Sequence, residues 1–251
     1  MNVQGLAAIV TGAASGLGEA TARQLAAQGA KVAVFDMNLE AAQKVASEIG
    51  GIAVECNVAD AESATQAFET AKAAHGPARI VVSCAGIAPA SKVVGRNGAH
   101  DLDLFAKVIN VNLIGTFNMT RLACVDMLEL DPIDGERGVI VNTASVAYAD
   151  GQIGQAAYAA SKGGVASLTL PVAREMAPKG IRVMTIAPGI MATPMLLGMP
   201  QEVQDALNAS VPMGRMGKPA EYAQLVNHIV ENGYLSGEVI RLDGVLRMAP
   251  K

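Results

Sequence analysis

The sequence contains no tryptophan, and aromatic residues make up only 3% of its 251 residues. Hydrophobic residues nevertheless account for 51%, so the core must consist mainly of Ala, Val, Ile, Leu and Met. Charged residues make up 17%, and this excludes a disordered chain, because such chains combine low hydrophobicity with a high net charge. The composition is typical of a parallel β-sheet with helices on both faces, in which the strands are unbroken aliphatic runs.

Basic clusters are also absent. The formal net charge is −4 and the isoelectric point is near 5.4, which argues against a nucleic-acid-binding protein, because neutralising phosphates needs a concentrated basic surface. No stretch of about 18 apolar residues is free of charges and helix breakers, so we expect no membrane span. Residues 1–12 lack the basic region and the cleavage site of a signal peptide. We therefore expect a cytoplasmic protein that binds neither nucleic acid nor membranes.

Cysteine and histidine are scarce, with three of each. They are widely separated in the sequence: Cys56, Cys84, Cys124, His75, His100 and His228. An odd number of scattered cysteines fits reduced thiols better than a disulfide framework or a zinc site. The scatter of the histidines agrees with this, and we predict no metal.

Short aliphatic runs alternate with segments of helical periodicity along the whole chain. The predicted strands are 6–11, 31–36, 52–56, 79–83, 139–143, 182–187 and 238–242. The predicted helices are 18–28, 38–49, 60–74, 103–130 and 155–177. Because parallel neighbours need crossover helices, this order predicts an α/β fold with a single doubly wound, Rossmann-type sheet of about seven strands, in one domain over residues 1–251.

Two segments, 88–100 and 189–218, interrupt the alternation and are too long to be mere connections. We expect them to shape a substrate site. The second contains an apolar cluster that suits either a core loop or a flexible lid: Met195, Leu196, Leu197 and Met199.

A glycine-rich turn follows the first predicted strand and opens the first helix. Its glycines are Gly12, Gly16 and Gly18, with Ser15 and Leu17 between them. Glycines let the backbone approach a pyrophosphate, and the helix N-terminus offers it unpaired N–H groups. The spacing G-x-x-x-G-x-G differs from the usual G-x-G-x-x-G pattern, so the position in the fold indicates a dinucleotide site more strongly than the pattern does. The alternative is a tight turn with no ligand.

Asp36 ends the second predicted strand, eighteen residues after Gly18. A carboxylate at this place accepts hydrogen bonds from the ribose hydroxyls of the adenosine and repels a 2′-phosphate. Neither the glycine turn nor Met37 and Asn38 supply a cation for that phosphate, so we predict NAD as the cofactor rather than NADP. The alternative is that Asp36 only begins the turn before the next helix.

Tyr158 and Lys162 lie four residues apart, one helical turn on the same face. Ser145 lies just after the fifth predicted strand, at the edge where doubly wound sheets bind ligands, and Asn112 lies in the preceding long helix. Each residue alone fits a surface pair, a strand-end cap or a solvent-facing helix position. Together, in this order, they predict a catalytic set.

Hydride transfer from a secondary alcohol needs a base for the hydroxyl proton, and a phenol with a pKa of about 10 is too weak at neutral pH. The ammonium of Lys162, with the positive charge of oxidised nicotinamide, is expected to lower the pKa of Tyr158. We expect Ser145 to hydrogen-bond the substrate oxygen and Asn112 to anchor a water that connects Lys162 to solvent.

With these residues the chain resembles the short-chain dehydrogenase/reductase family over its whole length. Further matching blocks are Asn142-Thr-Ala-Ser145, Gln155-Ala-Ala-Tyr158 and Ile186-Ala-Pro-Gly189. Within the family, the chain most resembles members that oxidise (S)-3-hydroxyacyl-CoA to 3-oxoacyl-CoA with NAD. The resemblance implies a homotetramer whose substrate is a small molecule, an acyl-CoA or a hydroxysteroid.

The resemblance also implies roles for individual residues. The cofactor would contact Gly12, Ser15, Gly16, Leu17, Gly18, Asp36, Asn57, Val58, Cys84, Ala85, Gly86, Tyr158, Lys162, Ile190, Met191 and Thr193. The substrate would contact Ser145, Gln155 and Tyr158. Two positions depart from the family pattern. Asn57 replaces an Asp that faces adenine, and Ser83-Cys84 replaces Asn-Asn; we expect Cys84 to be a packing residue rather than a nucleophile.

Other functions are compatible with parts of this pattern. A different NAD-linked secondary-alcohol or hydroxysteroid dehydrogenase would carry the same catalytic set, since fold and catalytic residues do not choose a substrate. A 3-oxoacyl-carrier-protein reductase is disfavoured by Asp36 and by the acidic isoelectric point. An NAD-binding regulatory protein without turnover is disfavoured because Tyr158 and Lys162 are both present.

Overall fold

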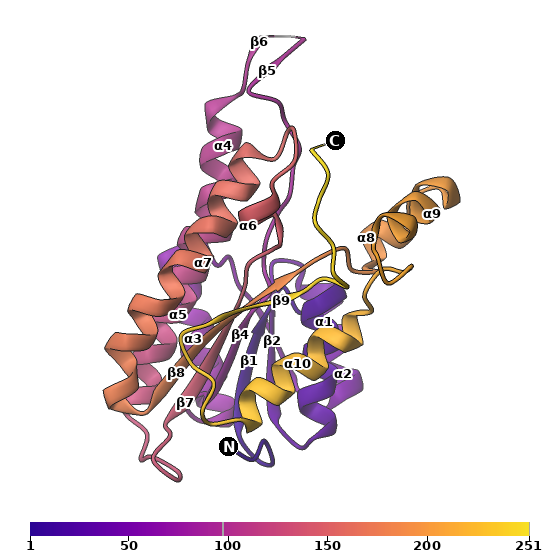
Figure 1. Cartoon of the computed structure of the whole chain (residues 1–251). Helices are drawn as coiled ribbons and strands as arrows, with labels where there is room; N and C mark the ends of the chain where they lie inside the picture. The colour runs from indigo at the N-terminus through magenta and orange to yellow at the C-terminus, as the bar shows by residue number, and fades with distance from the viewer. Residues whose placement is uncertain (97, 251) are drawn as a thin grey trace.

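The computed structural model describes residues 1–96 and 98–250, and seven of its strands form one sheet (Figure 1). In spatial order they are β3 (Ile52–Glu55), β2 (Lys31–Asp36), β1 (Ala7–Thr11), β4 (Ile80–Ser83), β7 (Gly138–Thr143), β8 (Ile181–Pro188) and β9 (Val239–Leu242). Every neighbouring pair is parallel. The predicted doubly wound sheet is confirmed, and all seven predicted strands agree with the observed ones to within one residue at each end.

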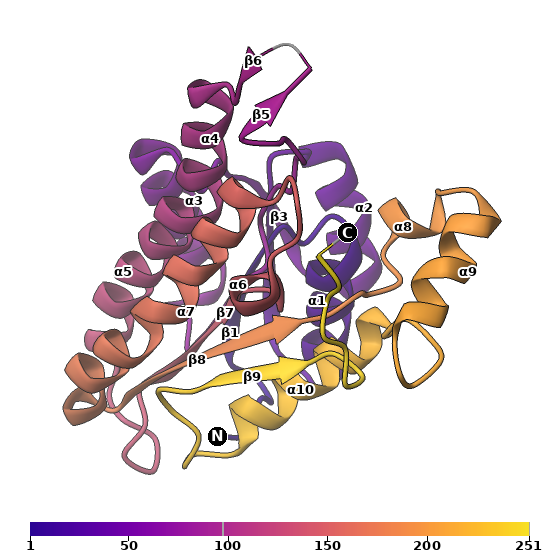
Figure 2. The same ribbon diagram turned by 45° about the horizontal axis from the view of Figure 1, so that its top comes forward.

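Helices cover both faces of the sheet (Figures 1 and 2). One face carries α1 (Gly16–Ala27), α2 (Leu39–Ile49) and α10 (Pro219–Glu231). The other carries α3 (Ala61–His75), α5 (Gly115–Leu128) and α7 (Ala156–Met176). Side chains alternate along β1, so that Ala8 and Val10 join the first core and Ile9 joins the second. Because both faces are covered, the central strands are apolar at nearly every position.

The predicted helix 103–130 is interrupted in the structure. It consists of α4 (Leu102–Ile109), a π-helical turn η1 (Asn110–Ile114) and α5. Within the turn, Asn112 is fully buried, and its carbonyl accepts a hydrogen bond from Thr116 Oγ1 at 2.7 Å. Single π turns inside α-helices are frequent at functional sites. The predicted span was correct, but the change of helical pitch at Asn112 was not expected.

Several shorter elements differ from the predictions. Segment 189–218 was expected to be irregular, but it contains α8 (Pro194–Leu197) and α9 (Gln201–Ser210). Segment 88–100 contains a small hairpin of β5 (Val94–Gly95) and β6 (Gly98–Ala99); its residue 97 lies outside the described residues. Two short helices, α6 (Ala147–Asp150) and η2 (Ala177–Lys179), and the long helix α10 were not predicted. The hairpin and the α8–α9 segment both protrude from the body (Figures 1 and 2).

The carboxyl ends of the strands define the functional edge of the sheet. The chain runs from β1 to β2 and β3 on one side, and to β4, β7 and β8 on the other, so the order reverses between β1 and β4. In open α/β sheets, ligands bind at such a reversal, outside the carboxyl ends. Within residues 1–96 and 98–250, no helix combines the length and apolar character needed to cross a bilayer.

Candidate functional site

The glycine turn connects β1 to α1 at the edge where the strand order reverses. Gly12 and Gly16 have φ of +61° and +57°, a backbone region that favours glycine. A Cβ at Gly12 would lie 2.8 Å from the backbone N and Cα of Ala85, so the turn packs directly against the chain that follows β4. The turn therefore presents bare backbone and the N-terminus of α1 to any ligand above it.

Gly18 gives a direct test of this close packing. A Cβ there would overlap the carbonyl oxygen of Gly12. We expect Gly18→Ala to distort the turn, to destabilise the fold by about 2 kcal/mol and to weaken NADH binding at least about tenfold. Fluorescence titration with NADH and thermal unfolding measure both effects. The matched control is Gly163→Ala in α7, where an added Cβ meets nothing within 4 Å. Equal NADH affinity in the parent and Gly18→Ala would show that the turn does not bind the nucleotide.

A cleft runs along this edge, and most of the predicted cofactor residues line it. They are Gly12, Ser15, Gly16, Leu17, Gly18, Asp36, Asn57, Val58, Cys84, Ala85, Gly86 and Thr193. The lining also includes residues that sequence reasoning missed: Met37, Cys56, Ile87, Val111, Pro194 and Met195. Most of the missed residues directly follow or precede a predicted one, so their place in the chain was the available signal. Ile190 and Met191 line a neighbouring pocket instead.

Asp36 lies in the cleft and also supports the glycine turn. Its Oδ2 accepts a hydrogen bond from the backbone N–H of Ala14 at 3.1 Å, and its Oδ1 accepts one from Asn38 at 2.9 Å. Asp36 therefore begins the turn before α2 and also lines the cleft, so its role in the turn leaves it placed for a ribose. Asn57 similarly uses its amide oxygen to accept the N–H of Ala59 at 3.1 Å, and one lone pair of that oxygen stays available.

These residues fit a dinucleotide. A pyrophosphate needs backbone N–H donors at a helix N-terminus and room for close approach, and the turn at Gly12 and Gly16 provides both. A ribose needs an acceptor at the end of the second strand, and Asp36 is the last residue of β2. Apolar side chains such as Val58 and Val111 line the same cleft.

Tyr158 and Lys162 lie on the first turns of α7, with Lys162 Nζ 5.9 Å from the centre of the Tyr158 ring. Lys162 is buried, and its Nζ donates a hydrogen bond to the carbonyl oxygen of Thr143 at 2.7 Å. Burial lowers the pKa of Lys162 to about 8, and a small opposing effect comes from Cys84. The lysine is therefore held by the end of β7, a contact that the sequence did not predict.

The phenol of Tyr158 is buried and lies beside Ser145. Burial raises the pKa of the phenol, and a hydrogen bond with Ser145 lowers it. The further lowering by Lys162 together with oxidised nicotinamide stays a prediction. Ser145 also accepts the N–H of Ala147 at 3.2 Å, which fixes its hydroxyl at the start of α6.

Asn112 connects the π turn to the cofactor side of the cleft. Its Oδ1 accepts the N–H of Ile87 at 2.8 Å, and its Nδ2 donates to Ile87 O at 2.8 Å and to Ser161 Oγ at 3.0 Å. Both amide protons are therefore used within the protein, and one lone pair is left for the water predicted at this place. A Cβ at Gly86 would lie 3.1 Å from Asn112 Oδ1 and 3.5 Å from Lys162 Nζ. Gly86 is thus the point where the cleft and the catalytic candidates meet.

Residues 6–204 match the family model described as short chain dehydrogenase. The chain belongs to the short-chain dehydrogenase family. It is 49% identical over 255 residues to 3-hydroxyacyl-CoA dehydrogenase type-2 of Rattus norvegicus, covering 99% of this chain and 98% of the relative. It is 37% identical to (3R)-3-hydroxyacyl-CoA dehydrogenase of Homo sapiens, covering 96% and 95%. The crystal structure of 3-hydroxyacyl-CoA dehydrogenase type-2 from Mycobacterium avium superposes with a TM-score of 0.93 at 41% identity, covering 98% of both chains.

The resemblance predicted from the sequence is confirmed by these findings, and so is the prediction of an oxidoreductase. Membership of the short-chain dehydrogenase family implies a nicotinamide cofactor, in agreement with the cleft. Burial raises the pKa of the Cys84 thiol, which agrees with the packing role expected for it.

The loop before α7 is joined to two segments that are distant in the chain. Ser91 N donates to Gly154 O at 2.8 Å, which joins segment 88–100 to the loop before α7. The second is the C-terminal tail, where the carbonyl oxygen of Pro250 accepts a hydrogen bond from Ile153 N at 3.0 Å. Gln155, predicted to meet the substrate, accepts the N–H of Gln152 at 3.0 Å with its side chain and so orders the same loop.

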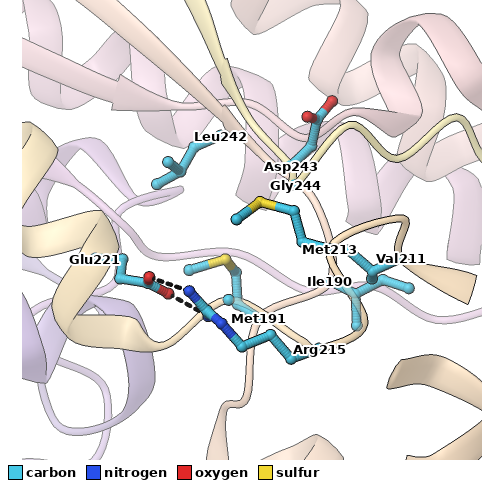
Figure 3. Close-up of a pocket in the computed structure, with 10 residues that line it drawn as sticks. Ile190, Met191, Val211, Met213, Arg215, Glu221, Leu242, Asp243 and Gly244 are labelled. Atoms are coloured by element: carbon cyan, nitrogen blue, oxygen red, sulfur yellow. Dashed lines mark hydrogen bonds and ion pairs between the residues drawn. The ribbon is translucent and has the colours of Figure 1, made fainter. Parts of the chain in front are cut away.

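A second pocket lies at the base of the α8–α9 segment (Figure 3). Met191 and Met213 line it, and Arg215 is joined to Glu221 by two hydrogen bonds of 2.6 and 2.8 Å. The segment leaves and returns to the body here, since Ala192 N donates to Gly217 O at 2.7 Å. In this short-chain dehydrogenase, backbone hydrogen bonding between the two ends of the α8–α9 segment thus fixes the protruding helices to the body.

Proposed function

We propose that the chain oxidises (S)-3-hydroxyacyl-CoA to 3-oxoacyl-CoA with NAD as the cofactor. The observation that carries the proposal is that Tyr158, Lys162 and Ser145 lie at the same sheet edge as the glycine turn. The names of relatives at 49% identity over the full length support this choice of substrate among the reactions that such a site can perform.

The glycine turn and Asp36 would hold the dinucleotide, which would supply an acceptor for the hydride of the carbinol carbon. Tyr158 would accept the proton of the substrate hydroxyl, and Ser145 would donate a hydrogen bond to the substrate oxygen and hold it for transfer. Lys162, kept near the phenol by Thr143, would supply positive charge that stabilises the tyrosinate once it forms. Asn112 would keep Gly86 and Ile87 beside the lysine.

The preference for NAD rests on Asp36, whose carboxylate lines the cleft. Assembly as a homotetramer and a location in the cytoplasm belong to the same proposal. In support of the assembly, large apolar side chains are exposed on the single chain along α4, η1 and α5: Leu102, Ile114, Phe117 and Val125.

A panel of substrates tests the choice. We expect NADH formation with (S)-3-hydroxybutyryl-CoA and 2-methyl-3-hydroxybutyryl-CoA, and kcat/KM at least about tenfold lower with the (R) enantiomer and with a 17β-hydroxysteroid. The (R) enantiomer belongs in the panel because a relative at 37% identity is named for (3R) substrates. Turnover of the steroid alone, or a preference for the (R) thioester, would overturn the substrate assignment.

A further inference from the structure

Tyr222 is buried in the core on the face of the sheet opposite to α7. It lies in the first half of α10 and has no exposed surface. The preceding residue, Glu221, forms the bidentate pair with Arg215 and accepts the N–H of Lys218 at 2.7 Å (Figure 3). The start of α10 is therefore fixed, and with it the position of the Tyr222 ring.

The hydroxyl of Tyr222 reaches the carboxyl edge of the sheet. It lies 2.7 Å from Thr143 Oγ1 and 3.7 Å from Cys84 Sγ, and Thr143 Oγ1 also lies 3.7 Å from the same sulfur. The three polar atoms form a closed group between the ends of β4 and β7. A phenylalanine would fill the same volume without a polar atom, so the hydroxyl needs these partners to offset its burial.

Thr143 joins this group to the catalytic candidates. It is the last residue of β7, and its side chain points to the α10 face while its carbonyl oxygen accepts the hydrogen bond from Lys162 at 2.7 Å. The next residue, Ala144, is held by β8 through a 2.8 Å bond to Ile186 O, and Ser145 follows it. The orientation of Thr143 therefore depends on Tyr222 on one face of the sheet. On the other face, the same orientation determines where the Thr143 carbonyl holds Lys162.

We propose that Tyr222 is a positioning residue, whose hydroxyl fixes Thr143 so that the Thr143 carbonyl holds the ammonium of Lys162 beside Tyr158. The proposal depends on the role given to Lys162 above. The titratable groups that face Lys162 are Tyr158 on its own helix and Cys84 at the end of β4.

Tyr222→Phe removes only the hydroxyl. We expect kcat, measured with the best substrate of the panel, to fall about tenfold while KM for the substrate changes less than twofold, because positioning of the lysine is lost and substrate binding is not. A carbonyl that accepts a hydrogen bond from an ammonium favours the charged form of the lysine. Loss of the bond to the Thr143 carbonyl should therefore lower the pKa of Lys162. A ¹⁵N NMR titration of the Lys162 side chain should therefore show a midpoint at lower pH than in the parent.

Two further variants make the test specific. Thr143→Val removes the partner hydroxyl and should have the same effect, and the double variant should be no worse than either single one. Tyr234→Phe, at a fully exposed tyrosine, is the matched control and should equal the parent. An unchanged kcat and an unchanged Lys162 midpoint in Tyr222→Phe, or additive losses in the double variant, would overturn the proposal. If Tyr222→Phe does not fold, Thr143→Val and its rescue by Thr143→Ser decide the question. If the parent turns over no substrate, the proposed function fails, and the NMR titration still tests the positioning.

Discussion

Replacing Tyr158 with phenylalanine is expected to lower kcat at least about a hundredfold and to leave the affinity for NAD unchanged, as removal of a general base should. The substitution keeps the aromatic ring and removes only the oxygen that would accept the substrate proton. Steady-state kinetics and NADH titration separate the two effects, since a loss confined to kcat indicates an interaction made in the transition state.

The acidity of the phenol provides a second measurement of the same role. Burial raises the pKa of Tyr158, and the hydrogen bond with Ser145 opposes this rise. In Ser145→Ala the opposing bond is lost, so the pKa should rise further and the increase of the oxidation rate with pH should move to higher pH. Tyr148→Phe, at the α6 tyrosine, is the matched control. Parent-like turnover in Tyr158→Phe would remove this residue from the mechanism.

The sheet and the main site residues could be predicted because their signals are local. A strand buried on both faces must be an aliphatic run, as in residues 31–36, and a close backbone approach needs glycine, as at Gly12. The four-residue separation of Tyr158 and Lys162 places them on one face of any helix. None of these features depends on what other segments do.

The contacts that could not be predicted depend on distant segments. The bond from Lys162 to Thr143, the support of Thr143 by Tyr222 and the packing of the C-terminal tail on Ile153 each join residues that are far apart in the chain. The α9 helix was missed for a different reason. It buries no residue, and it lies in a segment that was interpreted as one long irregular interruption of the alternation of strands and helices.

The double variant Asp36→Ser with Met37→Arg is expected to raise the ratio of kcat/KM for NADP over NAD by about a thousandfold. Removing the carboxylate ends its repulsion of the 2′-phosphate, and the new guanidinium adds a charge-assisted hydrogen bond, each contributing about 1.5 to 3 kcal/mol. Met37 lines the cleft and is 68% exposed, so a longer side chain has room there. Serine retains an acceptor for the N–H of Asn38 and loses the bond to Ala14.

The ratio is the informative quantity because Asp36 has two roles. Losing its bond to Ala14 loosens the glycine turn and weakens both nucleotides alike, so this effect cancels when NADP is compared with NAD. The two single variants separate the contributions of repulsion and of the new charge to the ratio. Met37→Arg keeps the repulsion between Asp36 and the 2′-phosphate and should change the ratio least, whereas Asp36→Ser removes that repulsion. A ratio that stays at the parent value in the double variant would place the adenosine ribose away from Asp36. The carboxylate would then serve only to order the turn between β1 and α1.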